Sequence, residues 1–360
     1  MTTVGEVEKD AVIGGKRIVD VHHHVFPQAL VQAYRQRDSA PRMTEVPGLR
    51  GIRLPNGAMG TGESLDMGPG MQSPLSEELL DPELHLRDMD RGGIDLAVLS
   101  VSAPSIDALD TADAVVVARE CNDELAELVR RYPDRFAATA VVPLRSADGG
   151  VSELERAVNL GLRGVGVLSN VDGLHLADEC FQDLFAAAAQ LDVPFVLHPT
   201  TPVHAAEVDD YALLVMIGFH MDTTACALRL VFSGMFERHP DLKFVLPHMG
   251  AVLPFILGRL DHEAEIKFPL LDPPVTLSSS PSEQIRRFYL DTACLWRPAV
   301  EMGVSIFGAE HMMVGTDYPY WTIEPSLALA EETDLTPDQR TLISHGTADR
   351  VFGLGSPVTA

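Results

Sequence analysis

The sequence lacks the features of several large classes of protein. Its four cysteines form no CxxC pair, which argues against a zinc ribbon or a disulfide framework and suits a reducing compartment. It has no run of about 18 apolar residues, and segment 1–17 has no apolar signal core. Positive charge is scarce, with 27 lysines and arginines against 52 acidic residues. We therefore expect a cytoplasmic protein with no membrane partner and no nucleic acid partner, because phosphate neutralisation needs a basic face.

Apolar residues, in contrast, are abundant, at 46% of the 360 residues, which is enough for a large core. Short β-rich segments alternate with helical patterns at 110–131, 150–160, 179–191, 222–239 and 297–308. The β-rich segments are nearly continuously apolar, as parallel strands covered on both faces are. They lie at 17–25, 95–103, 136–144, 163–170, 194–200, 243–250, 288–294 and 311–319. This alternation predicts one α/β domain over residues 1–360, closed into a (β/α)8 barrel.

An insertion at residues 38–76 interrupts the alternation after the first strand. It is rich in Gly, Pro, Ser and Met, and within it GLRGIRLPNGAMG predicts a small hairpin that turns at Asn56-Gly57. Long loops of this kind are usually functional lids or disordered segments. Because a barrel places the loop after strand one over the mouth of the active site, we expect a lid.

The segment RIVDVHHHVFP, residues 17–27, places three histidines at the end of a β-branched strand. Alternate side chains of a strand share a face, so His22 and His24 point one way and His23 the other. Two imidazoles about 7 Å apart along a strand can converge on one metal ion. A polar loop that happens to hold histidines explains this segment equally well when it is taken alone.

Three further strand ends carry side chains of the kinds that bind metals. His198 closes the fifth predicted strand, His248 the sixth and Asp317 the eighth. A lone histidine at a strand end is commonly a hydrogen-bonded structural residue, but four such strand ends in one chain indicate a site at the carboxyl end of a barrel. Three imidazoles and a carboxylate with one open position are typical of catalytic zinc, and the same ligands serve manganese.

The chemistry of such a site follows from the ion and its neighbours. A bound zinc ion lowers the pKa of its water from about 15.7 towards about 7. Asp317 binds the ion or accepts a proton from that water, and His248 is suited to general acid/base catalysis because imidazole titrates near neutrality. We predict one ion per chain, because the fourth predicted strand, RGVGVLSN, has no lysine that could bridge a second ion as a carbamate.

These motifs together resemble the amidohydrolase superfamily. HPTTP (198–202), VGTDYP (314–319) and the long block 222–261 resemble the branch that contains aminocarboxymuconate semialdehyde decarboxylase. The resemblance implies a metal-dependent barrel, usually with zinc, in which the catalytic histidine is His248 and the metal ligands are His22, His24, His198 and Asp317. The hydroxybenzoate decarboxylases of the same branch have a first motif that resembles Glu-x-His. This chain has His-x-His instead, which favours the semialdehyde-type arrangement. The family's glycine-rich run after the catalytic histidine is reduced here to HMGA, residues 248–251. We therefore expect Met249 to reshape the pocket floor.

Two arginines are candidates for binding a substrate carboxylate, which guanidinium holds bidentately. The resemblance implies that Arg259, in LGRLD, enters the active site of a neighbouring subunit, and hence that the protein is a homodimer. The alternative is a surface arginine paired with Asp261 or Glu263. Arg53, in the predicted hairpin, is the candidate from the insertion, slightly ahead of Arg50.

Three functions fit these residues. The first is a metal-dependent, non-oxidative decarboxylase of a small unsaturated or aromatic carboxylic acid. The second is a metal-dependent hydrolase or hydratase, in which water appears in the product. The third is a catalytically silent barrel that keeps its metal for stability or serves a complex, which the five filled site positions disfavour. Metal-bound hydroxide serves both of the first two chemistries, and the resemblance favours decarboxylation.

Overall fold

The apolar segments predicted as strands form a closed parallel barrel. The computed structural model describes residues 17–68, 71–171, 173–202, 205–208 and 210–355. The barrel strands are β1 (Val19–His24), β5 (Leu96–Ser100), β6 (Phe136–Ala138) with β7 (Ala140–Val141), β8 (Val165–Leu168), β11 (Phe195–His198), β12 (Phe244–Leu246), β13 (Tyr289–Asp291) and β14 (Met312–Met313). The predicted barrel is confirmed, with each observed strand inside its predicted segment.

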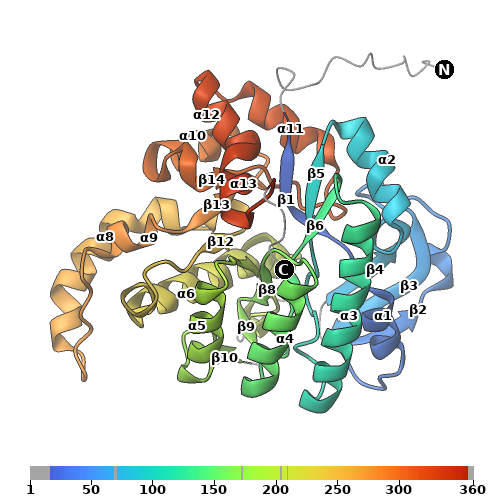
Figure 1. Cartoon of the computed structure of the whole chain (residues 1–360), viewed down its shortest axis with the longest axis horizontal. Helices are drawn as coiled ribbons and strands as arrows, with labels where there is room; N and C mark the ends of the chain where they lie inside the picture. The colour runs from blue at the N-terminus through green and yellow to red at the C-terminus, as the bar shows by residue number, and fades with distance from the viewer. Residues whose placement is uncertain (1–16, 69–70, 172, 203–204, 209, 356–360) are drawn as a thin grey trace.

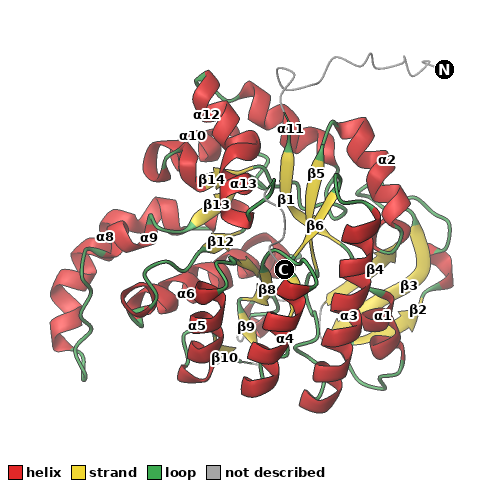
Figure 2. Cartoon of the chain, in the orientation of Figure 1, coloured by secondary structure: helices red, strands yellow, loops and turns green. Residues whose placement is uncertain are grey.

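The third strand of the barrel is split at Thr139, so that β6 pairs with β5 and β7 pairs with β8. Parallel bridges from Asp20 to Val314 and from His23 to Tyr318 join the first strand to the last and close the barrel. Figure 2 shows the barrel strands near the centre and most helices outside them. The carboxyl ends of all eight strands therefore meet at one mouth.

Helices cover the outside of the barrel and fill the connections between its strands (Figure 1). The helices are α1 (Gln28–Arg35), α2 (Pro82–Gly92), α3 (Thr111–Arg131), α4 (Ala147–Asn159), α5 (Gln182–Gln190), α6 (Phe219–Phe232), α7 (Met235–Arg238), α8 (Leu253–Lys267), α9 (Pro281–Ile285), α10 (Arg297–Phe307), α11 (Ile323–Glu332), α12 (Pro337–Thr341) and α13 (Thr347–Phe352). Shorter connections include β9 (Asn170–Val171) and β10 (Leu174–His175), which form an antiparallel pair.

The inside of the barrel is filled by small and branched apolar side chains, one or two from each contributing strand. Buried residues of this interior cluster include Val19, Val21, Val98, Val196 and Val245. Phe352 of α13 belongs to the same cluster and caps it. A packed interior of this kind leaves the strand ends as the place for polar side chains.

The insertion after the first strand forms a small antiparallel sheet in the order β2 (Arg42–Glu45), β3 (Gly60–Gly68), β4 (Met71–Ser76). The sequence did not predict this sheet. The predicted hairpin is confirmed, because Arg53 and Met59 form an antiparallel bridge around the Asn56-Gly57 turn. Figure 1 places this sheet beside the barrel, at the right of the view.

One helical stretch, Leu214–Phe232, is long and apolar enough to cross a membrane by length and composition alone. It consists of a π-helical segment, Leu214–Gly218, followed directly by α6. Part of its surface packs into the protein core through Cys226, Ala227, Leu230 and Val231. Its first half also exposes the apolar side chains of Val215, Met216, Ile217 and Met221.

Candidate metal centre

The first two histidines reach the barrel mouth because the pairing register of β1 shifts. Val19 and Val21 point into the barrel interior, and strict alternation would turn His22 and His24 outward. The register against β5 shifts between Asp20 and His23, and the Asp20 carboxylate accepts the backbone N–H of His22 at 3.1 Å. A bulge of this kind re-aims side chains beside active sites. As predicted, His22 and His24 share one side and His23 takes the other.

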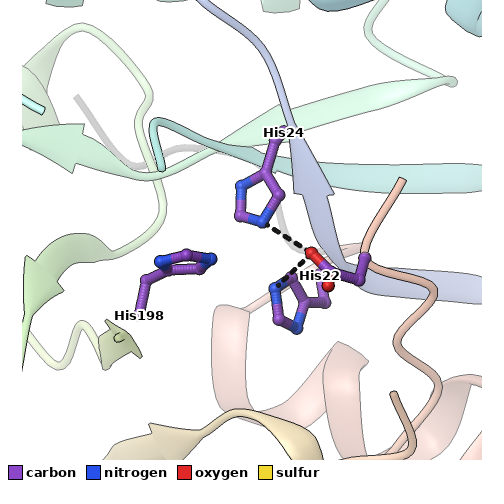
Figure 3. A group of neighbouring side chains, drawn as sticks. His22, His24 and His198 are labelled. Carbon is purple, nitrogen blue, oxygen red and sulfur yellow. Dashed lines mark ion pairs between the residues drawn. The ribbon is translucent and has the colours of Figure 1, made fainter. Parts of the chain in front are cut away.

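His198 comes from β11, across the barrel from β1, whereas Asp317 follows β14, the strand next to β1. His198 closes β11 in the same phase as the inward-pointing Val196. Asp317 follows β14 with a positive φ of 60°, and its N–H donates to the carbonyl of His22 at 2.9 Å. The ligand atoms of His22, His24, His198 and Asp317 all lie within 4.8 Å of one another. Figure 3 shows the labelled imidazoles converging, with dashed lines for the ion pairs of His22 and His24 with Asp317.

Each of the three imidazoles is oriented through its Nδ1 atom. Nδ1 of His22 lies 2.7 Å from Oδ2 of Asp291, and Nδ1 of His198 lies 2.7 Å from the carbonyl oxygen of Pro199. Both partners only accept, so these Nδ1 atoms carry the hydrogen. Nδ1 of His24 is 3.1 Å from Oγ of Ser100. The Nε2 atoms are thereby free to bind an ion, and partners of this kind commonly fix metal-binding histidines.

The electrostatics of the four residues fit a divalent cation. Burial, together with neighbouring histidines, holds the pKa of His198 well below its usual value, and burial lowers the pKa of His24. Burial would raise the pKa of Asp317, but His22 and the other histidines hold it well below its usual value. Two imidazoles are thus neutral and the carboxylate is ionised, which is the protonation that metal ligands need.

The pKa of His22 indicates that the site favours a positive charge beside its two carboxylates. Burial alone would lower its pKa, but the carboxylates of Asp291 and Asp317 raise it well above the usual value. Nε2 of His22 and Nε2 of His24 each lie 3.2 Å from Oδ1 of Asp317. All three atoms are buried, and none of them makes a hydrogen bond within the described residues. A site that favours a positive charge and gathers three such ligand atoms fits a metal ion.

His248 lies beside this group on a strained loop. His248, Met249 and Ala251 all have positive φ, which non-glycine residues rarely adopt. The loop is held by the backbone N–H of His248, which donates to Oδ1 of Asp291 at 2.8 Å. Nε2 of His248 lies 3.5 Å from Oδ2 of Asp317. Strain of this kind gathers at functional sites.

The side chain of Met249 does not reach the site. It is 3% exposed, belongs to the main hydrophobic core and packs beside Gly303 of α10. The expectation that Met249 shapes the pocket floor is therefore wrong. With positive φ on the three residues 248, 249 and 251, the loop turns this side chain away from the cavity, a conformation that the sequence did not predict.

A cavity of about 360 Å³ opens beside the metal-type cluster, within the size range of small-molecule sites. The inserted sheet forms one wall and the start of α6 another. Ser102 Oγ and the Tyr320 hydroxyl, 2.8 Å apart, supply polar groups. The lining residues are Met67, Met71, Gln72, Ser73, Pro74, Ser102, Ala103, His198, Ala212, Leu214, Val215, Phe219, His220, His248, Asp317, Tyr320 and Trp321.

The two predicted arginines do not line this cavity. Arg53 is exposed, and its guanidinium donates to the carbonyl of Gly57 within the hairpin at 2.6 Å. Arg259 lies on α8 with 77% of its side chain exposed, 3.7 Å from Glu263. The part of the chain that the structure describes thus places no lysine or arginine on the cavity wall.

Sequence reasoning missed two residues of the site. Asp291 holds both His22 and the loop of His248, and its only signal in the sequence is an acidic residue inside the apolar run FYLDTA. His220 lines the cavity and stacks on His248. Nothing in its helical segment distinguishes it from a surface histidine.

Comparison with known proteins agrees with this geometry. The amidohydrolase family profile matches residues 19–354. The chain belongs to the amidohydrolase family. Among its amidohydrolase relatives, gamma-resorcylate decarboxylase of Rhizobium radiobacter is 33% identical, over 78% of this chain and 90% of that protein. The 2-amino-3-carboxymuconate-6-semialdehyde decarboxylase of Dictyostelium discoideum is 29% identical, over 67% of each chain.

A solved amidohydrolase structure is also similar to this chain. Dihydroxybenzoic acid decarboxylase from Polaromonas, with bound manganese and the inhibitor 2-nitroresorcinol, superposes with a TM-score of 0.77 at 28% identity. The match covers 95% of this chain and 98% of that one. The fold and the family are therefore shared over nearly the whole chain.

Proposed function

We propose that this protein is a metal-dependent, non-oxidative decarboxylase of a small unsaturated or aromatic carboxylic acid. One observation carries the proposal: three histidines and an aspartate converge beside His248 at the wall of a largely apolar cavity. The relatives support it, because the proteins similar to this chain over most of its length include a gamma-resorcylate decarboxylase and a semialdehyde decarboxylase.

The four converging residues are the proposed ligands of one ion, which is zinc or, alternatively, manganese. When bound, a divalent ion supplies positive charge that attracts the acid and stabilises negative charge formed on it. The Polaromonas relative holds manganese, and three imidazoles with one carboxylate accept either metal. Elemental analysis of protein purified without added metal tests the choice between the two.

The reaction replaces the carbon–carboxylate bond by a carbon–hydrogen bond, so each turnover consumes one proton and releases CO2. His248 and Asp317 are the proposed acid/base residues. Nε2 of His248 is 3.5 Å from Oδ2 of Asp317, and both residues line the cavity, so a proton carried by His248 can be transferred to a substrate bound there. Asp291 fixes His248 in this position through the backbone.

The insertion 38–76 acts as a lid in this proposal. Met67 of β3 and Met71 and Pro74 of β4 face the cavity that His248 and Asp317 also face. An apolar cover excludes water and strengthens the electrostatic interactions beneath it. Arg53, on the same insertion, remains the proposed second contact for the substrate carboxylate, which it reaches only when the hairpin moves.

A homodimer completes the proposed site. The described cavity wall has no cationic side chain, whereas Arg259 is exposed on α8, which projects from the barrel at the left of Figure 1. Large apolar side chains are exposed on and after the same helix, with Phe255 82% and Leu270 76% exposed. Exposed apolar side chains on a projecting element favour a second protein surface, and Arg259 would reach the site of that second copy.

Product analysis tests the proposal directly. Purified metal-loaded protein is incubated with a panel of unsaturated and aromatic acids, and the products are identified by mass spectrometry. Loss of CO2 supports decarboxylation. Gain of water, with the carboxylate retained, would assign the alternative hydrolase or hydratase activity.

A further inference from the structure

His220 is a second imidazole on the cavity wall. It lies in the first turn of α6, directly after the π-helical segment Leu214–Gly218, and such wide turns are frequent at functional sites. Its ring stacks on that of His248, with centroids 5.4 Å apart and an interplanar angle of 27°. The side chain therefore has a fixed place relative to the proposed acid/base residue.

One ring nitrogen of this imidazole makes no hydrogen bond within the described residues. Its Nδ1 atom is buried and has no partner among the described residues. Burial, and then the neighbouring His248, lower its pKa, so the ring is neutral near pH 7, with one nitrogen that donates and one that accepts. Its neighbours on this wall, Leu214, Val215 and Phe219, are apolar. A polar side chain on such an apolar wall can bind a polar group of a molecule in the cavity.

His220 is not part of the metal-type cluster of His22, His24, His198 and Asp317. His248 stands between the two, because its ring contacts that of His22 at a centroid distance of 5.1 Å and that of His220 on another side. A substrate whose carboxylate lies next to Asp317 would present the far part of its carbon skeleton to His220. The imidazole thus faces the substituents of the substrate and not the bond that breaks.

We propose that His220 determines specificity by hydrogen-bonding a hydroxyl group that the substrate carries away from its reacting carboxylate. This inference rests on the proposed function and narrows its substrate class to hydroxylated aromatic acids. One neutral hydrogen bond made in a largely apolar site corresponds to a preference of about tenfold for the hydroxylated acid.

To test the inference, kcat/KM is measured for 2-hydroxybenzoate and for the four dihydroxybenzoates that carry an additional hydroxyl at position 3, 4, 5 or 6. Wild type should favour at least one derivative by about tenfold in kcat/KM. His220→Phe, which keeps an aromatic ring against His248, should bring that ratio close to one. His220→Gln, which retains a donor and an acceptor, should restore part of it. The matched control is Phe219→Leu, which alters the same wall and should keep the ratio.

Binding of phenols gives the same comparison without turnover. Dissociation constants of phenol, catechol, resorcinol and hydroquinone are measured with wild type and His220→Phe. One dihydroxy compound should bind wild type about tenfold tighter than phenol, and His220→Phe should lose that difference. Equal ratios in the two proteins, or an equal loss of kcat/KM on every acid, would overturn the inference. Absence of CO2 from every acid, with the phenol discrimination intact, would overturn the proposed function alone.

Discussion

Asp291 joins His22 to the loop of His248. Its Oδ2 lies 2.7 Å from Nδ1 of His22, and its Oδ1 accepts the backbone N–H of His248 at 2.8 Å. Burial would raise the pKa of Asp291, but His22 holds it below the usual value, so the carboxylate is ionised. One side chain from β13 therefore sets both the proposed metal ligand and the proposed acid/base residue.

The first prediction is that Asp291→Asn weakens metal binding while the fold persists. Asparagine keeps an oxygen for the N–H groups of His248 and Ala293, but it turns an NH2 group towards Nδ1 of His22. Nδ1 must then accept, and the hydrogen moves to the ligand atom Nε2. We expect about a 10- to 100-fold loss of metal affinity in a chelator competition. Ser100→Ala, which removes a neutral partner of His24, should cost less. Wild-type affinity in Asp291→Asn would contradict the assigned tautomer.

The second prediction separates metal binding from catalysis. His198→Ala should lose both the ion and turnover, because His198 is one of four proposed ligands. His248→Ala should abolish turnover and retain about one ion per chain, because its Nε2 faces Asp317 from outside the four-residue cluster. Elemental analysis and product release are measured on the same preparations. A metal-free His248→Ala protein would make His248 a ligand, and two ions per wild-type chain would refute the single-ion site.

The barrel and the four-residue cluster were predictable because both depend on local pattern. Continuous apolar runs mark buried parallel strands, and a histidine or aspartate at the end of such a run must lie at the mouth. The bulge in β1 was not predictable, since it depends on the contact between the Asp20 side chain and the backbone of His22. The prediction that His22 and His24 lie on the same side of the strand was nonetheless correct, because alternation along a strand determines which residues share a face.

Residues that act through tertiary contacts could not be found from the sequence. Asp291 reads as an isolated acidic residue in a strand, and its role appears only when β13 lies beside β12. The position of His220 on the cavity wall depends on the π-helical turn before α6, which no residue pattern predicts. The sheet of the insertion was missed because Gly, Pro and Ser make up seven of the 15 residues of β3 and β4, and glycine and proline have low strand propensity.

The third prediction concerns pH and Asp107, which lines a second cavity of about 410 Å³ beyond Met67. Burial raises the pKa of Asp107 to about 7, although Arg145 opposes the shift. In the unfolded chain an aspartate titrates near 3.9. Between these values the folded protein binds the extra proton, so this group makes the free energy of unfolding fall as the pH rises from about 4 to about 7.

The variant Asp107→Asn should not show this fall in the free energy of unfolding. The variant should gain stability over wild type between pH 5.5 and pH 8, with no further gain above pH 8, as measured by urea unfolding at each pH. Asp334→Asn, an exposed residue in the loop before α12, controls for the removal of one negative charge. An advantage of Asp107→Asn that is equal at pH 5.5 and pH 8 would show that Asp107 titrates normally.

The last prediction concerns the shared site. Arg259→Ala and His248→Ala should each be inactive as homodimers, whereas Lys267→Ala, which removes another exposed cation of α8, should stay active. A mixed dimer of the two inactive chains contains one site with its own His248 and the Arg259 of the other chain. After random mixing half of the dimers are mixed and each has one intact site of two, so activity should recover to about a quarter of wild type per chain. Purified mixed dimers that remain inactive would place Arg259 outside the partner's site.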